Sequence, residues 1–143
     1  MSESAQSFPY KITIEVPFRD LDAMGHVNNA VYFSYMETVR IKFLIDLLAV
    51  TSVHDLPVIM AEATCTFKAP AFLGEQLIVG GGVSRFGSKS FDMIYRIDAG
   101  DGRLIALGKT VQVMYDYAAA RTLVVPEDFK AKVRAFQGEW TNT

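Results

Sequence analysis

The chain has 143 residues and half of them are hydrophobic, so it is long enough for one domain with a sizeable core. Its 14 basic and 16 acidic residues give a net charge of −2, which provides no general attraction to nucleic acid or to an anionic membrane surface. The first seven residues lack the basic start and apolar stretch of a signal peptide, and the single cysteine cannot form an intrachain disulfide. We therefore expect a single domain over residues 1–143, located in the reducing cytoplasm.

The hydrophobic pattern predicts a strand first and one long helix after it. Apolar and polar residues alternate over 11–16 with the period of a half-buried strand. A loop rich in turn-forming residues follows over 17–29, and helical spacing then runs from about Ala30 to Leu48. Charged residues interrupt this apolar segment, which therefore indicates a buried helix of a globular domain and not a membrane span.

Four further segments rich in β-forming residues are predicted: Val58 to Lys68, Gln76 to Phe86, Ser90 to Asp98 and Arg103 to Tyr117. The turns between them are short enough for hairpins, which predicts a meander. Odd-numbered apolar residues from Ile105 to Tyr115 mark one face of the last strand. The glycine run over 79–83 lacks the features of a phosphate-binding loop and indicates a β-bulge or bend. Pro126 begins a short terminal helix that runs to about Phe136.

This order of elements favours an α+β fold. A curved antiparallel sheet of about five strands would wrap around the long helix, because no other element is large enough to cover it. The short C-terminal helix would add to this core. Remaining sheet edges and apolar sheet surface would favour pairing between subunits.

Potential chemistry is concentrated in the stretch Phe18-Arg-Asp-Leu-Asp-Ala-Met-Gly-His-Val-Asn-Asn-Ala-Val-Tyr32. It places Asp20, Asp22 and His26 directly before the N-terminus of the long helix. A helix N-terminus carries roughly +0.5 of a charge and unpaired N–H groups that can polarise a carbonyl. A nearby carboxylate could then act as nucleophile or base. Composition and spacing alone nevertheless favour ordinary loop and capping chemistry for these residues.

The same stretch resembles the signature of the 4-hydroxybenzoyl-CoA thioesterase family of hotdog proteins, in which an Asp-Xaa-Asp-Xaa-Xaa-Gly loop precedes the central helix. The match continues through Tyr32, Glu37 and Arg40, and the element order fits to the end of the chain. The resemblance implies the hotdog fold and hydrolysis of acyl-CoA to free acid and CoA. Coenzyme A would be part of the substrate, and neither a separate cofactor nor a metal is expected.

Carried over by position, the catalytic aspartate of the family falls on Asp22, with Asp20 as the lesser candidate. The backbone N–H that faces the thioester oxygen falls on Asn29. Asp22 could attack the thioester or activate a water, and the sequence leaves both routes open. Some relatives have a histidine where Asn29 stands and others an asparagine where Met24 stands, so neither assists Asp22 here. His26 could orient Asp22 or a water, or make a plain loop hydrogen bond.

Six residues are expected to contact the substrate: Gly25, Tyr32, Glu62, Lys68, Arg85 and Lys89. The basic residues among them flank turns and could bind the phosphates of CoA, or be solvated turn charges. Glu62 could act across a subunit interface or be a solvated strand carboxylate. Glu37 and Arg40 can pair as ordinary neighbours on the helix. Cys65 lies in apolar surroundings and is expected in the core rather than as a nucleophile.

Two other functions remain open on the sequence. One is an acyl-thioester hydratase or dehydratase, although the Asp-Xaa-Asn-Pro-Xaa-His pattern of such enzymes is absent. The other is a non-catalytic module that binds acyl-CoA. The expected partner in every case is an acyl-CoA, without nucleic acid or membrane. The resemblance further implies a homodimer or homotetramer with active sites at the dimer interface, and the identity of the acyl group stays open.

Overall fold

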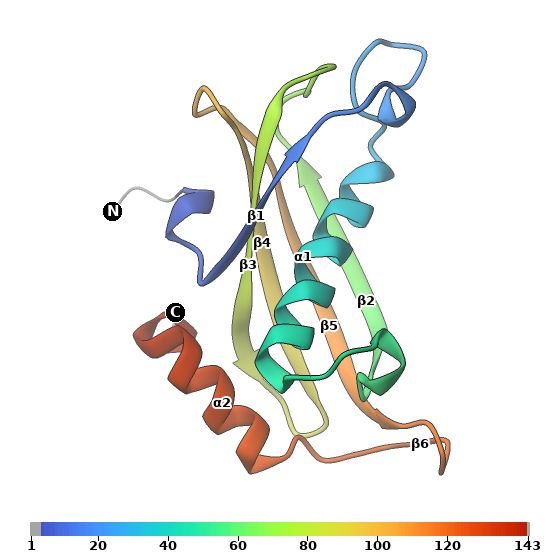
Figure 1. The fold of residues 1–143 in the computed structure, drawn as a ribbon, viewed down its shortest axis with the longest axis vertical. Helices are drawn as coiled ribbons and strands as arrows, with labels where there is room; N and C mark the ends of the chain where they lie inside the picture. Colours follow the sequence, from blue (N-terminus) through green and yellow to red (C-terminus); the bar gives the residue numbers. More distant parts are fainter. Residues whose placement is uncertain (1–3, 143) are drawn as a thin grey trace.

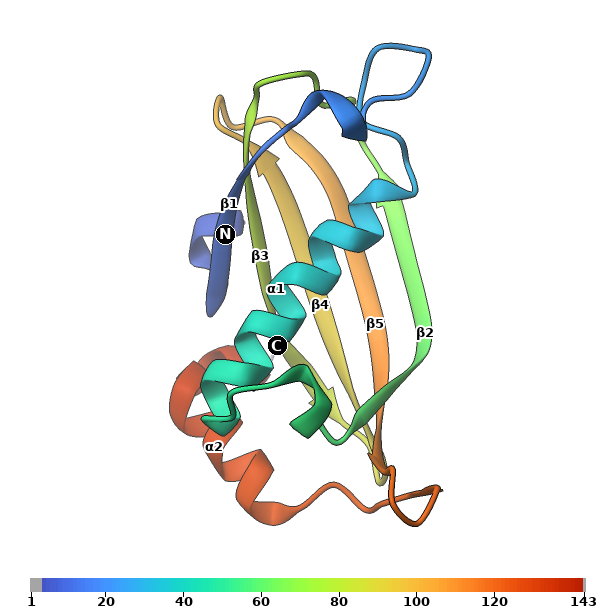
Figure 2. The same cartoon turned by 45° about the vertical axis from the view of Figure 1, so that its right-hand side comes forward.

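The computed structural model describes residues 4–142. Its helices are α1 (Val31–Leu48) and α2 (Glu127–Gln137), and its strands are β1 (Tyr10–Glu15), β2 (Val58–Phe67), β3 (Gln76–Phe86), β4 (Ser90–Ala99), β5 (Leu104–Asp116) and the short β6 (Arg121–Thr122). All strand pairs are antiparallel, and the sheet curves around α1 (Figures 1 and 2). The predicted α+β hotdog arrangement is confirmed.

The strand order is β1-β3-β4-β5-β2, with β6 paired to β5. Strands β3, β4 and β5 form the predicted meander, but the prediction was wrong for β2, which pairs with β5 instead of β3. Because β4 and β5 lie between β3 and β2, the segment over 68–75 must carry the chain across these two strands. This crossing segment passes the start of α1, where the Ala71 carbonyl accepts a hydrogen bond from the Val27 N–H at 2.9 Å.

The core lies between α1 and the concave face of the sheet. Every second residue of β4, from Phe91 to Ile97, is almost completely buried there, as its alternation predicted. On β5 the buried positions include Thr110, Gln112 and Met114, so the even-numbered residues, not the odd-numbered apolar ones, face the helix in this part of the strand. Both polar side chains make hydrogen bonds, although Gln112 Oε1 has no partner within residues 4–142. Gln112 donates to the Phe91 carbonyl at 3.0 Å, for example.

Three consecutive glycines, Gly80 to Gly82, let other segments pack tightly on β3. The ladder is regular through them and shifts only after Val83, so the predicted bulge lies one step further along the strand. A Cβ on Gly80 would lie 2.7 Å from Phe8, and a Cβ on Gly82 would lie 2.6 Å from Trp140. The N-terminal and C-terminal segments therefore cover the outer face of β3, the face away from α1. Within the described part of the chain, neither helix has the length and apolar character needed to cross a membrane.

Candidate functional site

The loop before α1 folds into a small hairpin. Leu21 and Val27 form an isolated antiparallel bridge, and the Asp22 N–H donates to the His26 carbonyl at 2.9 Å. Gly25 closes the turn with a φ of 87°, a backbone conformation that glycine adopts at little cost. This geometry brings Asp22 and His26 side by side, with 3.8 Å between Oδ1 and Nδ1.

The two carboxylates of the loop have different environments. Asp20 Oδ2 accepts a 2.6 Å hydrogen bond from the Tyr35 hydroxyl, which ties the loop to α1. Burial together with this hydrogen bond raises the pKa of Tyr35. Asp22 Oδ1 accepts the Met24 N–H at 2.9 Å, and the Asp22 side chain is 29% exposed. Asp20 is therefore a structural anchor, whereas Asp22 retains an oxygen for other contacts.

A free N–H group lies at the start of the helix. The Asn28 side chain and carbonyl accept the N–H groups of Ala30 and Val31 at 3.0 and 2.9 Å. The N–H of Asn29, the residue between Asn28 and Ala30, donates to no atom of residues 4–142. An unpaired donor at the positive end of a helix dipole suits a developing negative charge on a carbonyl oxygen.

A cavity of about 290 Å³ is lined in part by Asn29, the residue that carries this N–H group. Its lining brings together four residues predicted for the site: His26, Asn29, Tyr32 and Lys68. The Tyr32 ring packs 5.8 Å from the Phe67 ring, and burial raises the pKa of Tyr32 to about 12, so the phenol stays neutral. Asp22 and Gly25 belong to the adjacent hairpin and are not part of the lining itself.

Three predicted residues lie away from this cavity within the subunit. Glu62 is on the outer face of the edge strand, since strand alternation places it opposite to the neighbouring Ala63 that faces α1. Arg85 lies 3.6 Å from Asp92, and Lys89 donates to Thr122 at 3.3 Å. The strand register puts both basic residues toward the end of the sheet remote from Lys68.

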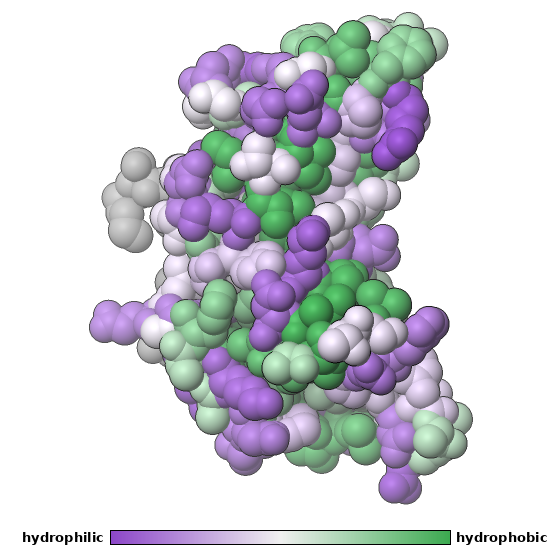
Figure 3. Space-filling view, viewed as in Figure 1, coloured by the Kyte–Doolittle hydropathy of each residue, from purple (hydrophilic) through white to green (hydrophobic). Residues whose placement is uncertain are grey.

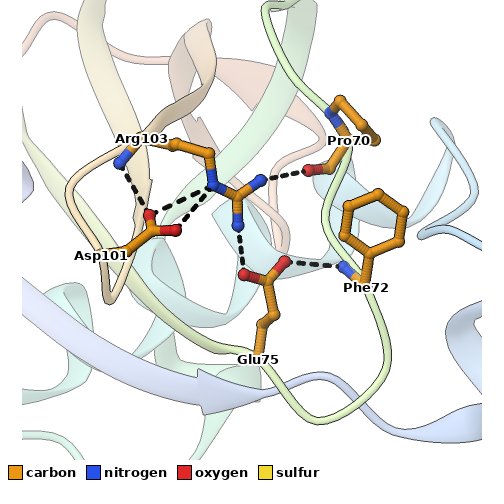
Figure 4. A network of polar contacts seen from close by, with 5 residues as sticks. All are labelled: Pro70, Phe72, Glu75, Asp101 and Arg103. Carbon is orange, nitrogen blue, oxygen red and sulfur yellow. Dashed lines mark hydrogen bonds and ion pairs between the residues drawn. The ribbon is translucent and has the colours of Figure 1, made fainter.

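Arg103 is a supporting residue that sequence reasoning missed. It donates to the Pro70 carbonyl at 3.0 Å, pairs with Asp101 at 3.0 Å and contacts the Glu75 carboxylate (Figure 4). Glu75 in turn accepts the Phe72 N–H at 2.9 Å. The hydrogen bonds that Asp101 accepts from Arg103 lower the pKa of the Asp101 carboxyl. The cluster fixes the crossing segment, which forms one wall of the cavity. The Asp-Gly-Arg sequence at 101–103 has the appearance of an ordinary turn and gave no signal of this role.

Across residues 4–142, no group of three or more His, Cys, Asp or Glu side chains is arranged to hold a metal ion. The candidate site therefore consists of a carboxylate, a histidine, a free backbone N–H and a mixed apolar and basic wall. Such a set can polarise a carbonyl and deliver a nucleophile or base to it.

Several proteins resemble this chain. A thioesterase from Thermus thermophilus, in complex with coenzyme A and Zn, is 32% identical and superposes with a TM-score of 0.84 over 93% of this chain and 98% of that one. A thioesterase superfamily protein from Jannaschia sp. CCS1 is 28% identical, with a TM-score of 0.79 over 90% and 82% of the two chains. The uncharacterized protein YsmA of Bacillus subtilis is 27% identical over 107 residues, which are 75% of this chain and 73% of that protein.

The chain also matches a protein-family model. The model of the thioesterase-like superfamily matches residues 16–133, a span that holds the hairpin loop, α1 and all six strands of the sheet except the first. The chain therefore belongs to the thioesterase-like superfamily and is a thioesterase of the hotdog fold.

Proposed function

We propose that the protein hydrolyses the thioester bond of an acyl-CoA, with Asp22 as the reacting carboxylate. The observation that carries this proposal is the free N–H of Asn29, a residue that lines a cavity beside the hairpin that holds Asp22. A thioester oxygen placed against this N–H would be polarised, and the charge that develops on it would be stabilised.

Two routes are compatible with this arrangement. Asp22 can attack the carbonyl carbon so that the C–S bond breaks, CoA leaves as a thiolate and a water then hydrolyses the anhydride. Alternatively, Asp22 takes a proton from the water that attacks the same carbon. His26 Nδ1 lies 3.8 Å from Asp22 Oδ1, close enough to orient the carboxylate in either route.

We further propose that two copies pair through β2. Among the described residues, this edge strand pairs with β5 alone, and most of its residues are exposed, including Met60 and Phe67. Antiparallel pairing of two β2 strands would continue the sheet and cover this surface. It would also place the remote end of one sheet, with Arg85 and Lys89, beside the cavity of the other copy. Those basic residues could then contact the CoA phosphates of the partner's substrate.

A matched pair of variants tests the catalytic assignment. Asp22→Asn should keep the fold and lower kcat by more than the roughly 10²–10³ that loss of one oxyanion donor costs. Asp20→Asn should keep most of the turnover, since an asparagine oxygen can still accept the Tyr35 hydroxyl. The measurement is release of free thiol from saturated acyl-CoAs, which a hydratase could not use. Near-normal turnover in Asp22→Asn, or an equal loss in Asp20→Asn, would contradict the assignment.

A further inference from the structure

Arg40 of α1 is a buried cation with few acceptors. Its side chain is 8% exposed, and its one hydrogen bond within residues 4–142 goes to the Tyr95 hydroxyl at 3.4 Å. The Glu37 carboxylate is 3.8 Å away, but the Glu37 side chain is 65% exposed, so water screens this pair. A guanidinium has five N–H donors and keeps its proton, and a buried charge without good partners is costly. An anion that approaches Arg40 would therefore be stabilised strongly.

Arg40 borders a cavity of about 170 Å³ between α1 and the strands β2 and β5. The remaining lining is mostly apolar, with Phe33, Met36 and Met60 among its residues. Thr110 is also part of the lining, and its hydroxyl is already bonded to Tyr95 at 2.6 Å. Ser34 and the largely exposed Glu37 are also in the lining, so the cavity combines four apolar residues with one buried positive charge.

This cavity and the candidate site follow one another along the seam between α1 and β2. The candidate site is lined by Tyr32 of the helix and Phe67 of the strand. The Arg40 cavity is lined by Met36 and Ala63, which lie further along the same two elements. Hydrophobic residues also show at the surface beside the lower half of α1 (Figure 3). An acyl chain with its thioester at the helix start would be directed along this seam.

The distance from Asn29 to Arg40 determines how long an acyl chain must be to reach Arg40. Asn29 and Arg40 are eleven positions apart, about 16 Å along a helix axis at 1.5 Å per residue. Helix side chains lean toward the N-terminus, which brings the guanidinium closer to Asn29 than its Cα is. The distance therefore corresponds to an acyl chain of medium length.

We propose that Arg40 binds a carboxylate at the far end of the acyl chain, so that the enzyme favours half-thioesters of medium-chain dicarboxylic acids. The planar fork of a guanidinium matches a carboxylate through two parallel hydrogen bonds. The small volume and apolar walls fit a carboxylate on a hydrocarbon chain better than a bulky phosphate. This proposal rests on the proposed function, because the thioester end is taken to lie at Asn29.

Hydrolysis of suberyl-CoA and octanoyl-CoA tests this specificity, because the two substrates have the same chain length and differ only in the terminal carboxylate. The wild-type enzyme should favour suberyl-CoA in kcat/KM. Arg40→Met should reduce this preference by about tenfold to a hundredfold, the range of a hydrogen bond to a charged group, while octanoyl-CoA hydrolysis changes little. Arg40→Lys, which keeps the charge and loses the fork, should show an intermediate preference and provides the test if Arg40→Met does not fold. A preference that is absent in the wild type, or unchanged in a folded Arg40 variant, overturns the proposal.

Glu37→Gln is the matched control, because it removes the surface carboxylate beside Arg40 and leaves the guanidinium in place. It should keep or increase the preference for suberyl-CoA. Calorimetric titration with free suberate separates this proposal from the proposed function. Suberate binding that is lost in Arg40→Met supports the carboxylate site even if no thioester is hydrolysed. Absence of suberate binding, or an Arg40 variant that only weakens self-association, counts against it.

Discussion

Asp20 and Asp22 show how single contacts separate residues that look alike in the sequence. The hydroxyl that meets Asp20 comes from the second turn of α1, and the N–H that meets Asp22 comes from its own hairpin. The sequence spacing could place both carboxylates before the helix, but it could not show which of them accepts a hydrogen bond from Tyr35. The distinction depends on a side chain 15 positions away, which the fold alone brings into contact.

Cys65 permits a prediction at the same scale. It is the only cysteine, lies opposite Gly108 in the β2–β5 ladder and is partly buried, and this burial raises the pKa of its thiol above the ordinary value of 9.0. Since the thiolate is the reactive form, alkylation by iodoacetamide should be slow at neutral pH and should still accelerate above pH 9.0. Cys65→Ala should retain thioester hydrolysis. An alkylation rate that levels off near neutral pH, or a loss of turnover in the variant, would show that the thiol has another role.

At the scale of elements, the crossing segment over 68–75 links the site to the turn between β4 and β5, which is distant in sequence. Its Pro70 carbonyl and its Glu75 carboxylate both contact Arg103, and its Ala71 carbonyl accepts the N–H of Val27 in the hairpin loop. This clamp at Arg103 therefore helps to position both the wall of the cavity and the loop that carries Asp22. The eight-residue connection is also held by backbone hydrogen bonds at Lys68, Ala69 and Gly74.

Arg103→Met should therefore loosen the crossing segment. We expect a loss of roughly 1–2 kcal/mol in the free energy of unfolding, because the lost hydrogen bonds involve charged but partly exposed groups. Urea denaturation measures this loss, and amide hydrogen exchange should rise over 69–75. Asp101→Asn is the control, since it leaves the contacts of Arg103 with Pro70 and Glu75 intact. Equal losses in the two variants would mean that the clamp does not depend on those two contacts.

At the scale of the whole molecule, the two sheet edges differ. On β1, charged and polar residues alternate with partly buried ones, while β2 is exposed along most of its length and has a single charged residue, Glu62. Edge strands with few charges are prone to pair with another chain. This contrast is the reason to place the subunit interface at β2.

Ala61→Lys tests this interface, because it would put like charges from two copies near each other at the middle of β2. The variant should weaken self-association by at least about tenfold in dissociation constant, measured by analytical ultracentrifugation. Thr13→Lys makes the same change on an exposed position of β1 and should leave association unchanged. A stable dimer in Ala61→Lys, or dissociation caused by Thr13→Lys, would place the interface elsewhere.

Local patterns in the sequence were enough to define the elements and their type, because alternation and helical spacing are properties of short stretches of chain. The predicted helix start at about Ala30 and the observed start at Val31 differ by one residue, and β3 was predicted with its observed bounds. The resemblance of the 18–32 stretch to a known signature also indicated the loop that holds Asp22 and Asn29.

Features that depend on contacts between distant segments were decided only by the tertiary structure. Strand order is one case, since β2 and β3 are neighbours in sequence but lie far apart in the sheet. The clamp at Arg103 is another, because its partners come from two separate turns. Arg40 is the third: its sequence suggested an ordinary pair with Glu37, whereas packing against the sheet buries the guanidinium beside the Tyr95 hydroxyl. Burial and pairing of a charge are properties of the packed molecule, so no local pattern encodes them.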